Sequence, residues 1–230
     1  MNKEIIYKAV SWDVVNWSKA VNFWEQHLPA NFEGMRALEL GGGDNCGLSL
    51  WLASKGADVV CSGYKGISEA AKNTHREYGY QKRISYEIID ALNIPYENEF
   101  DLICFKSMLG GIVREGRIGT AEKVMSQIHK ALRSRGKLVF AENLYATELH
   151  AFLRSLFGAG KNKWRYFTVE EMNMLTESFT NQQFGTYGVS GLFGFNEKAR
   201  NCLGVLDTLL LEKITGHKSR YIYGAVCEKS

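Results

Sequence analysis

The sequence predicts an α/β protein with a parallel sheet and helices on both of its faces. From residue 37 onward, short apolar runs alternate with amphipathic helical stretches, which is typical of strands joined by crossover helices. Several of the helical stretches stop at a glycine, the residue that most easily takes the left-handed conformation at a helix end. The chain has 230 residues, 45% of them hydrophobic, so it is long enough to bury the core of one elaborated domain.

Five apolar runs in the first part of the chain are the predicted parallel strands. They cover residues 36–40, 58–62, 84–89, 100–105 and 137–141. The stretches between them predict helices over residues 46–55, 68–78 and 120–135. These helices are followed directly by Gly56, Gly79 and Gly136. Ahead of the first strand, an apolar stripe over residues 14–28 predicts an N-terminal helix that ends before Pro29.

The last third of the chain predicts two helical stretches and two further strands. Thr168 and Glu171 have the spacing of a capping box, so a helix is expected over residues 168–179. Residues 184–189 and 221–227 are predicted strands. A helical insertion over residues 196–215 separates them, and its apolar stripe must pack on the core or on a partner. The stripe consists of Ala199, Leu203, Leu206, Leu210 and Ile214.

Composition argues against several classes of function. The net charge is only +3, with Lys and Arg dispersed among acids, so a nucleic-acid partner is not expected. No stretch approaches the roughly 20 apolar residues of a membrane span, and the N-terminus lacks a signal-peptide pattern, so neither membrane insertion nor export is expected. The five cysteines have no CxxC spacing, which favours reduced thiols in the cytoplasm. No metal-ligand spacing is found either, so we predict a metal-free site.

Three consecutive glycines, Gly41, Gly42 and Gly43, follow the first predicted strand and precede a helix. A strand, a glycine turn and a helix aim backbone N–H groups at a ligand. Glu39 and Asp44 flank the turn, and a dinucleotide pyrophosphate there would be repelled by both acids. The GxGxxG pattern is also incomplete, because Cys46 occupies the third glycine position. A cationic ligand removes the conflict, and S-adenosylmethionine carries both a sulfonium and an ammonium group.

Three strings together resemble class I S-adenosylmethionine-dependent methyltransferases. They are LELGGG at residues 38–43, IDA at 89–91 and ALRSRG at 131–136. The resemblance implies a Rossmann-like seven-stranded sheet of order 3-2-1-4-5-7-6 with strand 7 antiparallel. Three further strings resemble a bacterial subgroup associated with surface-polysaccharide gene clusters. They are FKSMLGGI at 105–112, FAENL at 140–144 and WRYF at 164–167.

The resemblance implies which residues hold the cofactor. Glu39 and the glycines Gly41, Gly42 and Gly43 would hold its methionine part, Asp90 would accept from the adenine amino group, and the Ala91 backbone would lie beside the ring. In the family an acid that binds the ribose hydroxyls usually ends the second strand, but here that position is Gly63. Ser62 and Tyr64 beside it are the predicted substitutes. If the register is correct, Gly63→Asp is expected to strengthen cofactor binding.

Further candidate residues follow the fourth and fifth strands, at the edge where open α/β sheets bind ligands. Lys106 is predicted to contact the cofactor and Ser107 the substrate. His150 and Glu142 are the two candidates for a general base. Residues 150–167 mix basic and aromatic side chains, which suits a lid over a glycan or an anionic sugar nucleotide. From it, Arg154, Trp164 and Tyr166 are predicted to bind substrate, with Lys161 and Lys163 nearby.

The predicted function is methyl transfer from S-adenosylmethionine to a small-molecule or sugar-containing acceptor, with oxygen favoured over nitrogen. The single domain, residues 1–230, would comprise an N-terminal helical cap (1–35), a cofactor-binding core (36–142), and substrate-side helices with the last two strands (143–230). Two alternatives stay open: a non-catalytic methyltransferase-like protein that lost cofactor affinity through Gly63, and an NAD-dependent oxidoreductase. Whether the protein forms a homodimer also stays open.

Overall fold

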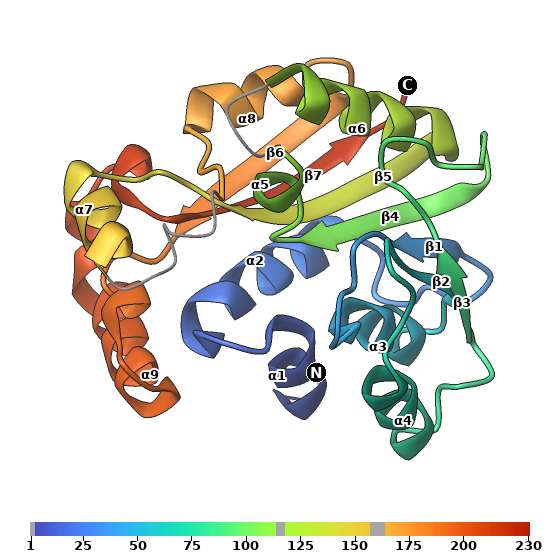
Figure 1. Ribbon diagram of the computed structural model, residues 1–230, viewed down its shortest axis with the longest axis horizontal. Coiled ribbons are helices and arrows are strands. Elements are labelled where there is room, and N and C mark those ends of the chain that lie inside the picture. The colour runs from blue at the N-terminus through green and yellow to red at the C-terminus, as the bar shows by residue number, and fades with distance from the viewer. Residues whose placement is uncertain (1–2, 114–117, 157–163) are drawn as a thin grey trace.

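The seven predicted strands form one sheet. The computed structural model describes residues 3–113, 118–156 and 164–230, and its strand order is β3-β2-β1-β4-β5-β7-β6 (Figure 1). The parallel strands are β1 (Arg36–Glu39), β2 (Asp58–Gly63), β3 (Ile84–Ile88), β4 (Phe100–Lys106) and β5 (Leu132–Asn143). β7 (Ile222–Glu228) lies between β5 and β6 (Thr180–Tyr187) and runs antiparallel to both. The expected strand order and antiparallel seventh strand are confirmed.

Helices cover both faces of the sheet (Figure 1). One face carries α1 (Lys3–Val10), α2 (Val14–His27), α3 (Gly47–Ser54) and α4 (Glu69–Glu77), and the other carries α5 (Leu109–Ile112), α6 (Ile118–Ala131) and α8 (Val169–Leu175). Each face has its own hydrophobic cluster, with three tryptophans in the first and several phenylalanines in the second. Because side chains alternate along a strand, Cys104 of β4 joins the first cluster and Phe105 joins the second. α7 (Glu148–Leu156) follows β5 at the carboxyl edge of the sheet.

The boundary between α6 and β5 differs from the prediction. The helix expected to reach residue 135 ends at Ala131, and β5 begins at the next residue, where Leu132 pairs with Phe100. Gly136 therefore lies within the strand and is not a helix C-cap. Tertiary pairing with β4 overrides the local helical pattern of this segment. The capping box of α8 is confirmed, since the Thr168 side chain accepts from the Glu171 N–H and the Glu171 side chain accepts from the Thr168 N–H.

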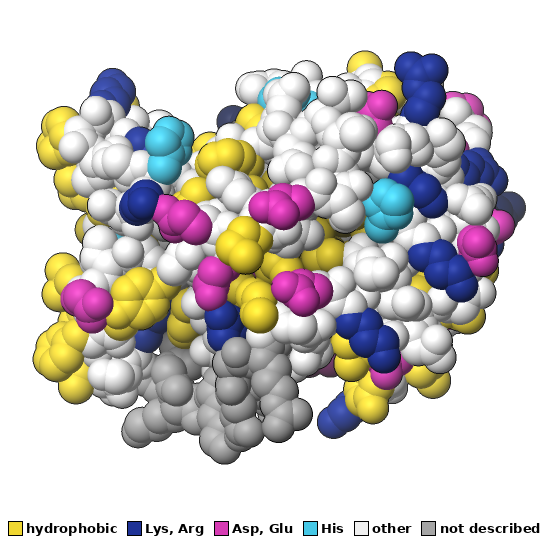
Figure 2. All heavy atoms as spheres, turned by 90° about the horizontal axis from the view of Figure 1, so that it is seen from above, with side chains coloured by type: hydrophobic (Ala, Val, Ile, Leu, Met, Phe, Trp, Pro, Cys, Tyr) yellow, Lys and Arg dark blue, Asp and Glu magenta, His cyan; other side chains and the backbone are white. Residues whose placement is uncertain are grey.

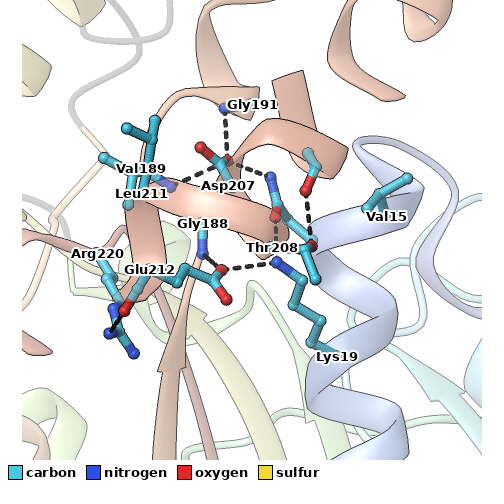
Figure 3. Close-up of polar contacts among 12 residues, drawn as sticks. Val15, Lys19, Gly188, Val189, Gly191, Asp207, Thr208, Leu211, Glu212 and Arg220 are labelled. Carbon is cyan, nitrogen blue, oxygen red and sulfur yellow. Dashed lines mark hydrogen bonds and ion pairs between the residues drawn. The ribbon is translucent and has the colours of Figure 1, made fainter. Parts of the chain in front are cut away.

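The insertion between β6 and β7 is one helical stretch with a π-helical turn inside it. It consists of α9 (Glu197–Leu206), the π turn Asp207–Leu211 and α10 (Glu212–Ile214). Asp207 accepts from the Val189, Ser190 and Gly191 N–H groups and from the Asn16 side chain on α2, while Lys19 of α2 pairs with Glu212 at 2.7 Å (Figure 3). The insertion is thus attached to α2 largely by polar contacts.

The apolar stripe of the insertion does not pack on the core. The face toward α2 presents Gly204, where an added Cβ would lie 2.8 Å from the Val15 Cβ, and the buried Asp207. Leu206, Leu210 and Ile214 are 42%, 49% and 71% exposed. A π turn inserts one extra residue and so rotates the following side chains around the helix axis. The prediction of core packing is wrong for these three residues, and packing on a partner stays a prediction.

A groove of about 370 Å³ lies between α6 and α8. Its floor is apolar, with Met125 and Leu175, and its rim carries Glu122 and Glu177. Figure 2, which looks onto this face, shows acidic side chains around an exposed apolar patch. No helix in the described ranges combines the length and the apolarity that crossing a bilayer requires.

Candidate functional site

The glycine turn after β1 has the strained backbone that only glycine adopts easily. Gly41 and Gly43 have φ angles of 65° and 60°, and the Gly42 N–H donates to the Ser62 carbonyl at 2.9 Å. An added Cβ at Gly41 would lie 2.9 Å from the Met108 side chain, whereas at Gly43 the nearest atom would be 3.9 Å away. The turn therefore packs against Met108 at Gly41 and is open at Gly43, where a ligand can approach the backbone.

Glu39 is buried at the end of β1, and one of its carboxylate oxygens contacts α3. Its Oε2 accepts from the Ser49 N–H at 2.7 Å and from the Ser49 hydroxyl at 2.5 Å. The carboxylate thereby caps the N-terminus of α3, and burial raises its pKa above the usual range. Glu39 thus caps α3 through Oε2, and its contact with the methionine part of the cofactor stays a prediction. Asp44 is exposed beside a cavity of about 260 Å³ that Tyr7 and Lys8 also line.

Asp90 and Ala91 lie directly after β3. One carboxylate oxygen of Asp90 accepts from the Leu92 N–H at 2.9 Å, and its second oxygen has no hydrogen bond to any described residue. Asp90 is half-buried and Ala91 is buried. The arrangement fixes the side chain by one oxygen and leaves the other for a donor such as an amino group.

The end of β2 has no space for a side chain at Gly63. An added Cβ would lie 2.8 Å from the Gly66 carbonyl oxygen, in a turn closed by the Gly66 N–H donating to Gly63 at 3.2 Å. The expectation that Gly63→Asp strengthens binding is therefore wrong on steric grounds. The Ser62 hydroxyl is buried and donates to the Glu39 carbonyl at 2.7 Å, so it does not replace the missing acid. Tyr64 is 69% exposed and keeps its side chain available.

Gly63→Ala is expected to lower the free energy of unfolding by about 2 kcal/mol, because the methyl group forces the Gly63–Gly66 turn apart. Urea unfolding measures the effect. Gly216→Ala is the matched control, since an added Cβ there meets no atom within 4 Å. Equal stability of the two variants would contradict the tight turn at Gly63.

Lys106 ends β4 and points toward the face that α2 covers. Its Nζ lies 4.6 Å from the Trp17 ring centroid, and no carboxylate or carbonyl of the described residues is within bonding distance of it. Burial lowers the pKa of Lys106 to about 8, and the charges of Glu142 and Glu39 only partly oppose this effect. The ammonium is thus a buried cation with unused donors.

Both predicted general bases are hydrogen-bonded within the protein. Glu142 is buried at the end of β5, where Oε2 accepts from the Met108 and Leu109 N–H groups at 2.9 and 2.8 Å and Oε1 from the Asn143 N–H at 3.0 Å. Burial raises its pKa to about 6. The carboxylate thus caps the N-terminus of α5, and its role as a general base stays a prediction.

His150 is buried in the N-terminal half of α7. Its Nδ1 lies 2.7 Å from the Thr147 hydroxyl oxygen and its Nε2 lies 2.8 Å from the Val189 carbonyl, and burial lowers its pKa. With Nε2 donating to the carbonyl, Nδ1 accepts from Thr147. Both ring nitrogens therefore have hydrogen-bond partners in this structure, and the role of His150 as general base stays a prediction.

The substrate-side candidates gather around the end of β5. The Arg154 guanidinium lies 3.9 Å from the Tyr166 ring centroid, and its Nη1 donates to the Leu144 and Tyr145 carbonyls at 3.0 and 3.1 Å. Trp164 packs across α5, where an added Cβ at Gly110 or Gly111 would collide with the indole. Ser107 has a φ of 49°, and its hydroxyl accepts from the Asn143 amide at 2.8 Å. Lys161 and Lys163 lie outside the described residues.

One further cluster bears on metal binding. The ligand atoms of Glu39, Cys46 and Cys61 lie within 4.8 Å of one another beneath the glycine turn. A hydrogen bond with Cys46 and burial both raise the pKa of the Cys61 thiol, which disfavours the thiolate that a metal needs. Glu39 is already engaged by Ser49. A metal-free site stays a prediction.

The chain resembles solved structures in its fold, although its sequence matches no family model. No protein-family model matches the sequence, and no curated protein matches it. Among solved structures, phosphoethanolamine N-methyltransferase 2 from Haemonchus contortus, in complex with phosphomonomethylethanolamine and S-adenosylhomocysteine, is similar with a TM-score of 0.61 and 16% identity. The match covers 93% of this chain and 52% of that one, so this chain spans about half the length of that enzyme.

Geranyl diphosphate C-methyltransferase from Streptomyces coelicolor A3(2) is similar with a TM-score of 0.63 and 10% identity, over 93% of this chain and 79% of that one. That structure contains Mg²⁺, geranyl diphosphate and S-adenosylhomocysteine. A geranyl diphosphate methyltransferase in complex with S-adenosylmethionine has a TM-score of 0.62 at 13% identity, over 93% and 85% of the two chains. The chain has the class I methyltransferase fold.

The methyltransferase fold explains why the candidate residues meet. In a parallel sheet the carboxyl ends of β1, β3, β4 and β5 share one edge, so residues far apart in the sequence come together there. The sequence singled out most of them but missed Met108, which packs on the glycine turn. Its apolar side chain gave no functional signal. The sequence also could not show that backbone N–H groups occupy Glu142.

Proposed function

We propose that this protein is an S-adenosylmethionine-dependent methyltransferase that acts on a small molecule, with residues 1–230 as one methyltransferase domain. The observation that carries the proposal is the open backbone at Gly43, in a glycine turn after β1 of a sheet with the methyltransferase strand order. Solved structures of the same fold contain S-adenosylmethionine or S-adenosylhomocysteine, which supports this choice of cofactor.

The residues present fit the two ends of such a cofactor. The backbone at Gly41, Gly42 and Gly43 would hold the amino-acid part, and the Lys106 ammonium, which lacks an acceptor among the described residues, suits its carboxylate. The spare oxygen of Asp90 suits the adenine amino group. The ribose has no acid at Gly63, so the exposed Tyr64 side chain is the proposed cover for that part.

The cofactor, when bound, supplies a methyl group on a positively charged sulfur, which makes the methyl carbon an electrophile. Catalysis then depends on orienting the acceptor and excluding water. Trp164 and Tyr166, on the segment that lies along α5, are proposed to perform this role. Since Glu142 and His150 both hydrogen-bond to other parts of the protein, the favoured acceptor is one that needs no strong base, such as an oxyanion or an acidic hydroxyl of a sugar-containing molecule.

Three finer proposals follow from the sequence. A role in surface-polysaccharide biosynthesis rests on the resemblance of residues 105–112, 140–144 and 164–167 to that bacterial subgroup. A cytoplasmic location rests on the cysteine pattern. A homodimer is proposed because the apolar stripe of the insertion is exposed. The small net charge is the reason for proposing no nucleic-acid partner. Screening sugar nucleotides with labelled methyl donor tests the first of these proposals.

Thermal unfolding in the presence of ligands tests the proposal against its rivals. S-adenosylhomocysteine at 100 times its Kd is expected to stabilise the protein by about 2.7 kcal/mol. Stabilisation by NAD in its place would favour the oxidoreductase. No stabilisation by either ligand at millimolar concentration would favour a non-catalytic protein, which the missing ribose acid at Gly63 also suggests.

Asp90→Ala is expected to weaken S-adenosylhomocysteine binding at least tenfold, because it removes an acceptor worth roughly 1.5 to 3 kcal/mol when charged. Isothermal titration calorimetry measures the effect. Asp58→Ala is the matched control, because Asp58 is an exposed acid at the opposite end of β2. Unchanged affinity in Asp90→Ala would remove Asp90 from the cofactor site.

A further inference from the structure

Arg154 is a buried cation without an acidic partner. Its side chain is 5% exposed, and no carboxylate of the described residues lies within ion-pair distance of it. Nη1 is satisfied by two backbone carbonyls, but Nη2 is buried and has no hydrogen-bond partner. Burial lowers the pKa of Arg154, and the groups that oppose this are tyrosines. The guanidinium therefore has one donor without a partner and a charge that no described carboxylate pairs with.

Such an arrangement is costly without a ligand. An unpaired buried donor lowers the stability of the folded protein, and a buried charge without a counter-charge lowers it further. Two half-buried arginines do have acidic partners, Arg165 with Glu171 at 2.5 Å and Arg200 with Glu197 at 3.2 Å. Arg220 resembles Arg154 in bonding to carbonyls, but it is only half-buried. Arg154 is thus an arginine whose charge the described residues do not balance.

The position of Arg154 connects it to the proposed active site. Its guanidinium stacks on the Tyr166 ring, and the charges of Arg154 and Glu142 both act on the pKa of Tyr166. Glu142 in turn acts on Lys106, the second cation that has no acceptor among residues 3–113, 118–156 and 164–230. Two unpaired cations therefore lie around the carboxyl ends of β4 and β5, where open α/β sheets bind ligands.

We propose that the methyl acceptor carries an oxyanion group, a phosphate or a carboxylate, and that Arg154 Nη2 donates to it. The inference rests on the proposed methyltransferase function, which it makes more specific. The planar guanidinium, already fixed by two carbonyls and by stacking on Tyr166, loses little conformational freedom when it binds an oxyanion. The anion supplies both the missing acceptor and the missing negative charge.

Calorimetric titration of inorganic phosphate, and separately of acetate, into the full chain saturated with S-adenosylhomocysteine tests the proposal. Wild-type protein is expected to bind at least one of the two anions saturably at low ionic strength. Arg154→Gln is expected to weaken that binding at least tenfold. Arg133→Gln, which changes an exposed arginine paired with Asp101 at 2.9 Å, is the matched control and should leave it unchanged.

Arg154→Lys is a second variant in case Arg154→Gln does not fold. It keeps a charge and a donor for the carbonyls but has no group at the Nη2 position, so it should also weaken anion binding at least tenfold. Absence of saturable binding of both anions to wild-type protein, or unchanged binding in the folded variants, would overturn the proposal. Loss of S-adenosylhomocysteine affinity in Arg154→Lys would also overturn it, because Arg154 would then serve the cofactor.

The same titrations separate the two proposals. If wild-type protein does not bind S-adenosylhomocysteine, the methyltransferase function fails. Phosphate and acetate titrated into the ligand-free chain then still report on Arg154. If S-adenosylhomocysteine binds and neither anion does, only the acceptor inference fails.

Discussion

Lys106→Met is expected to raise the free energy of unfolding by about 2 kcal/mol at pH 7 while weakening cofactor binding. The folded protein lowers the pKa of Lys106 from 10.5 to about 8, which corresponds to a cost of about 3 kcal/mol for the charged form. Loss of the contact with the Trp17 ring offsets about 1 kcal/mol of this gain. A lysine kept at such a cost is expected to serve binding.

The pH dependence of that gain follows from linkage. Between pH 8 and 10.5 the unfolded chain binds more protons at Lys106 than the folded chain, so the stability of the wild-type protein rises with pH there. The advantage of Lys106→Met should therefore be constant below pH 8 and shrink towards pH 10.5. Urea unfolding at pH 7 and pH 10 measures it, with the exposed Lys65→Met as control. A destabilised variant at pH 7 would show that Lys106 has a structural partner.

Glu142→Gln is expected to lower the free energy of unfolding by about 2 kcal/mol at pH 4.5, because the amide nitrogen cannot accept and the side chain no longer satisfies all three N–H groups. Hydrogen exchange should locate the loss at the amides of Met108 and Leu109. The exposed Glu148→Gln is the control. If stability and exchange do not change, Glu142 is free to act as a base and its structural role is wrong.

Glu142 also has a defined pH dependence. Its folded-state pKa is raised from 4.5 to about 6, so its contribution to stability is fully present below pH 4.5 and is lost as the pH rises through 6. The difference in stability between wild-type protein and Glu142→Gln should therefore be larger at pH 4.5 than at pH 7. If the difference in stability instead increases with pH, the hydrogen bonds from the N–H groups favour the ionised carboxylate more than burial disfavours it.

The sheet could be predicted because its signals are local. Each strand is a short apolar run, and the glycine turn and the Thr168–Glu171 capping box have fixed spacings. The strand order, in contrast, came from a family resemblance. Several boundaries differ where strand pairing decides. Leu132 joins β5 because it pairs with Phe100, and β6 begins at Thr180, ahead of the predicted residue 184, because Thr180 pairs with Glu228.

The site was predicted in its location but only partly in its roles. Residues at strand ends were found, because the topology brings them to one edge. Whether a carboxylate or an imidazole is free depends on partners that sequence spacing does not show, such as the Leu109 N–H on Glu142 and the Val189 carbonyl on His150. The sequence also does not show whether a position has space for a larger side chain. At Gly63 an added Cβ would lie 2.8 Å from the Gly66 carbonyl oxygen.

The π turn at Asp207–Leu211 lets the insertion hold one residue more than continuous α-helical winding would. Deletion of one residue from positions 208–211 would restore α-helical winding and leave the following segment, with Glu212 beside Lys19, in place. A deletion within α9 has no such slack and would rotate everything after it by about 100°. Among relatives, single-residue length variation in this insertion should therefore occur at residues 208–211 and not within α9.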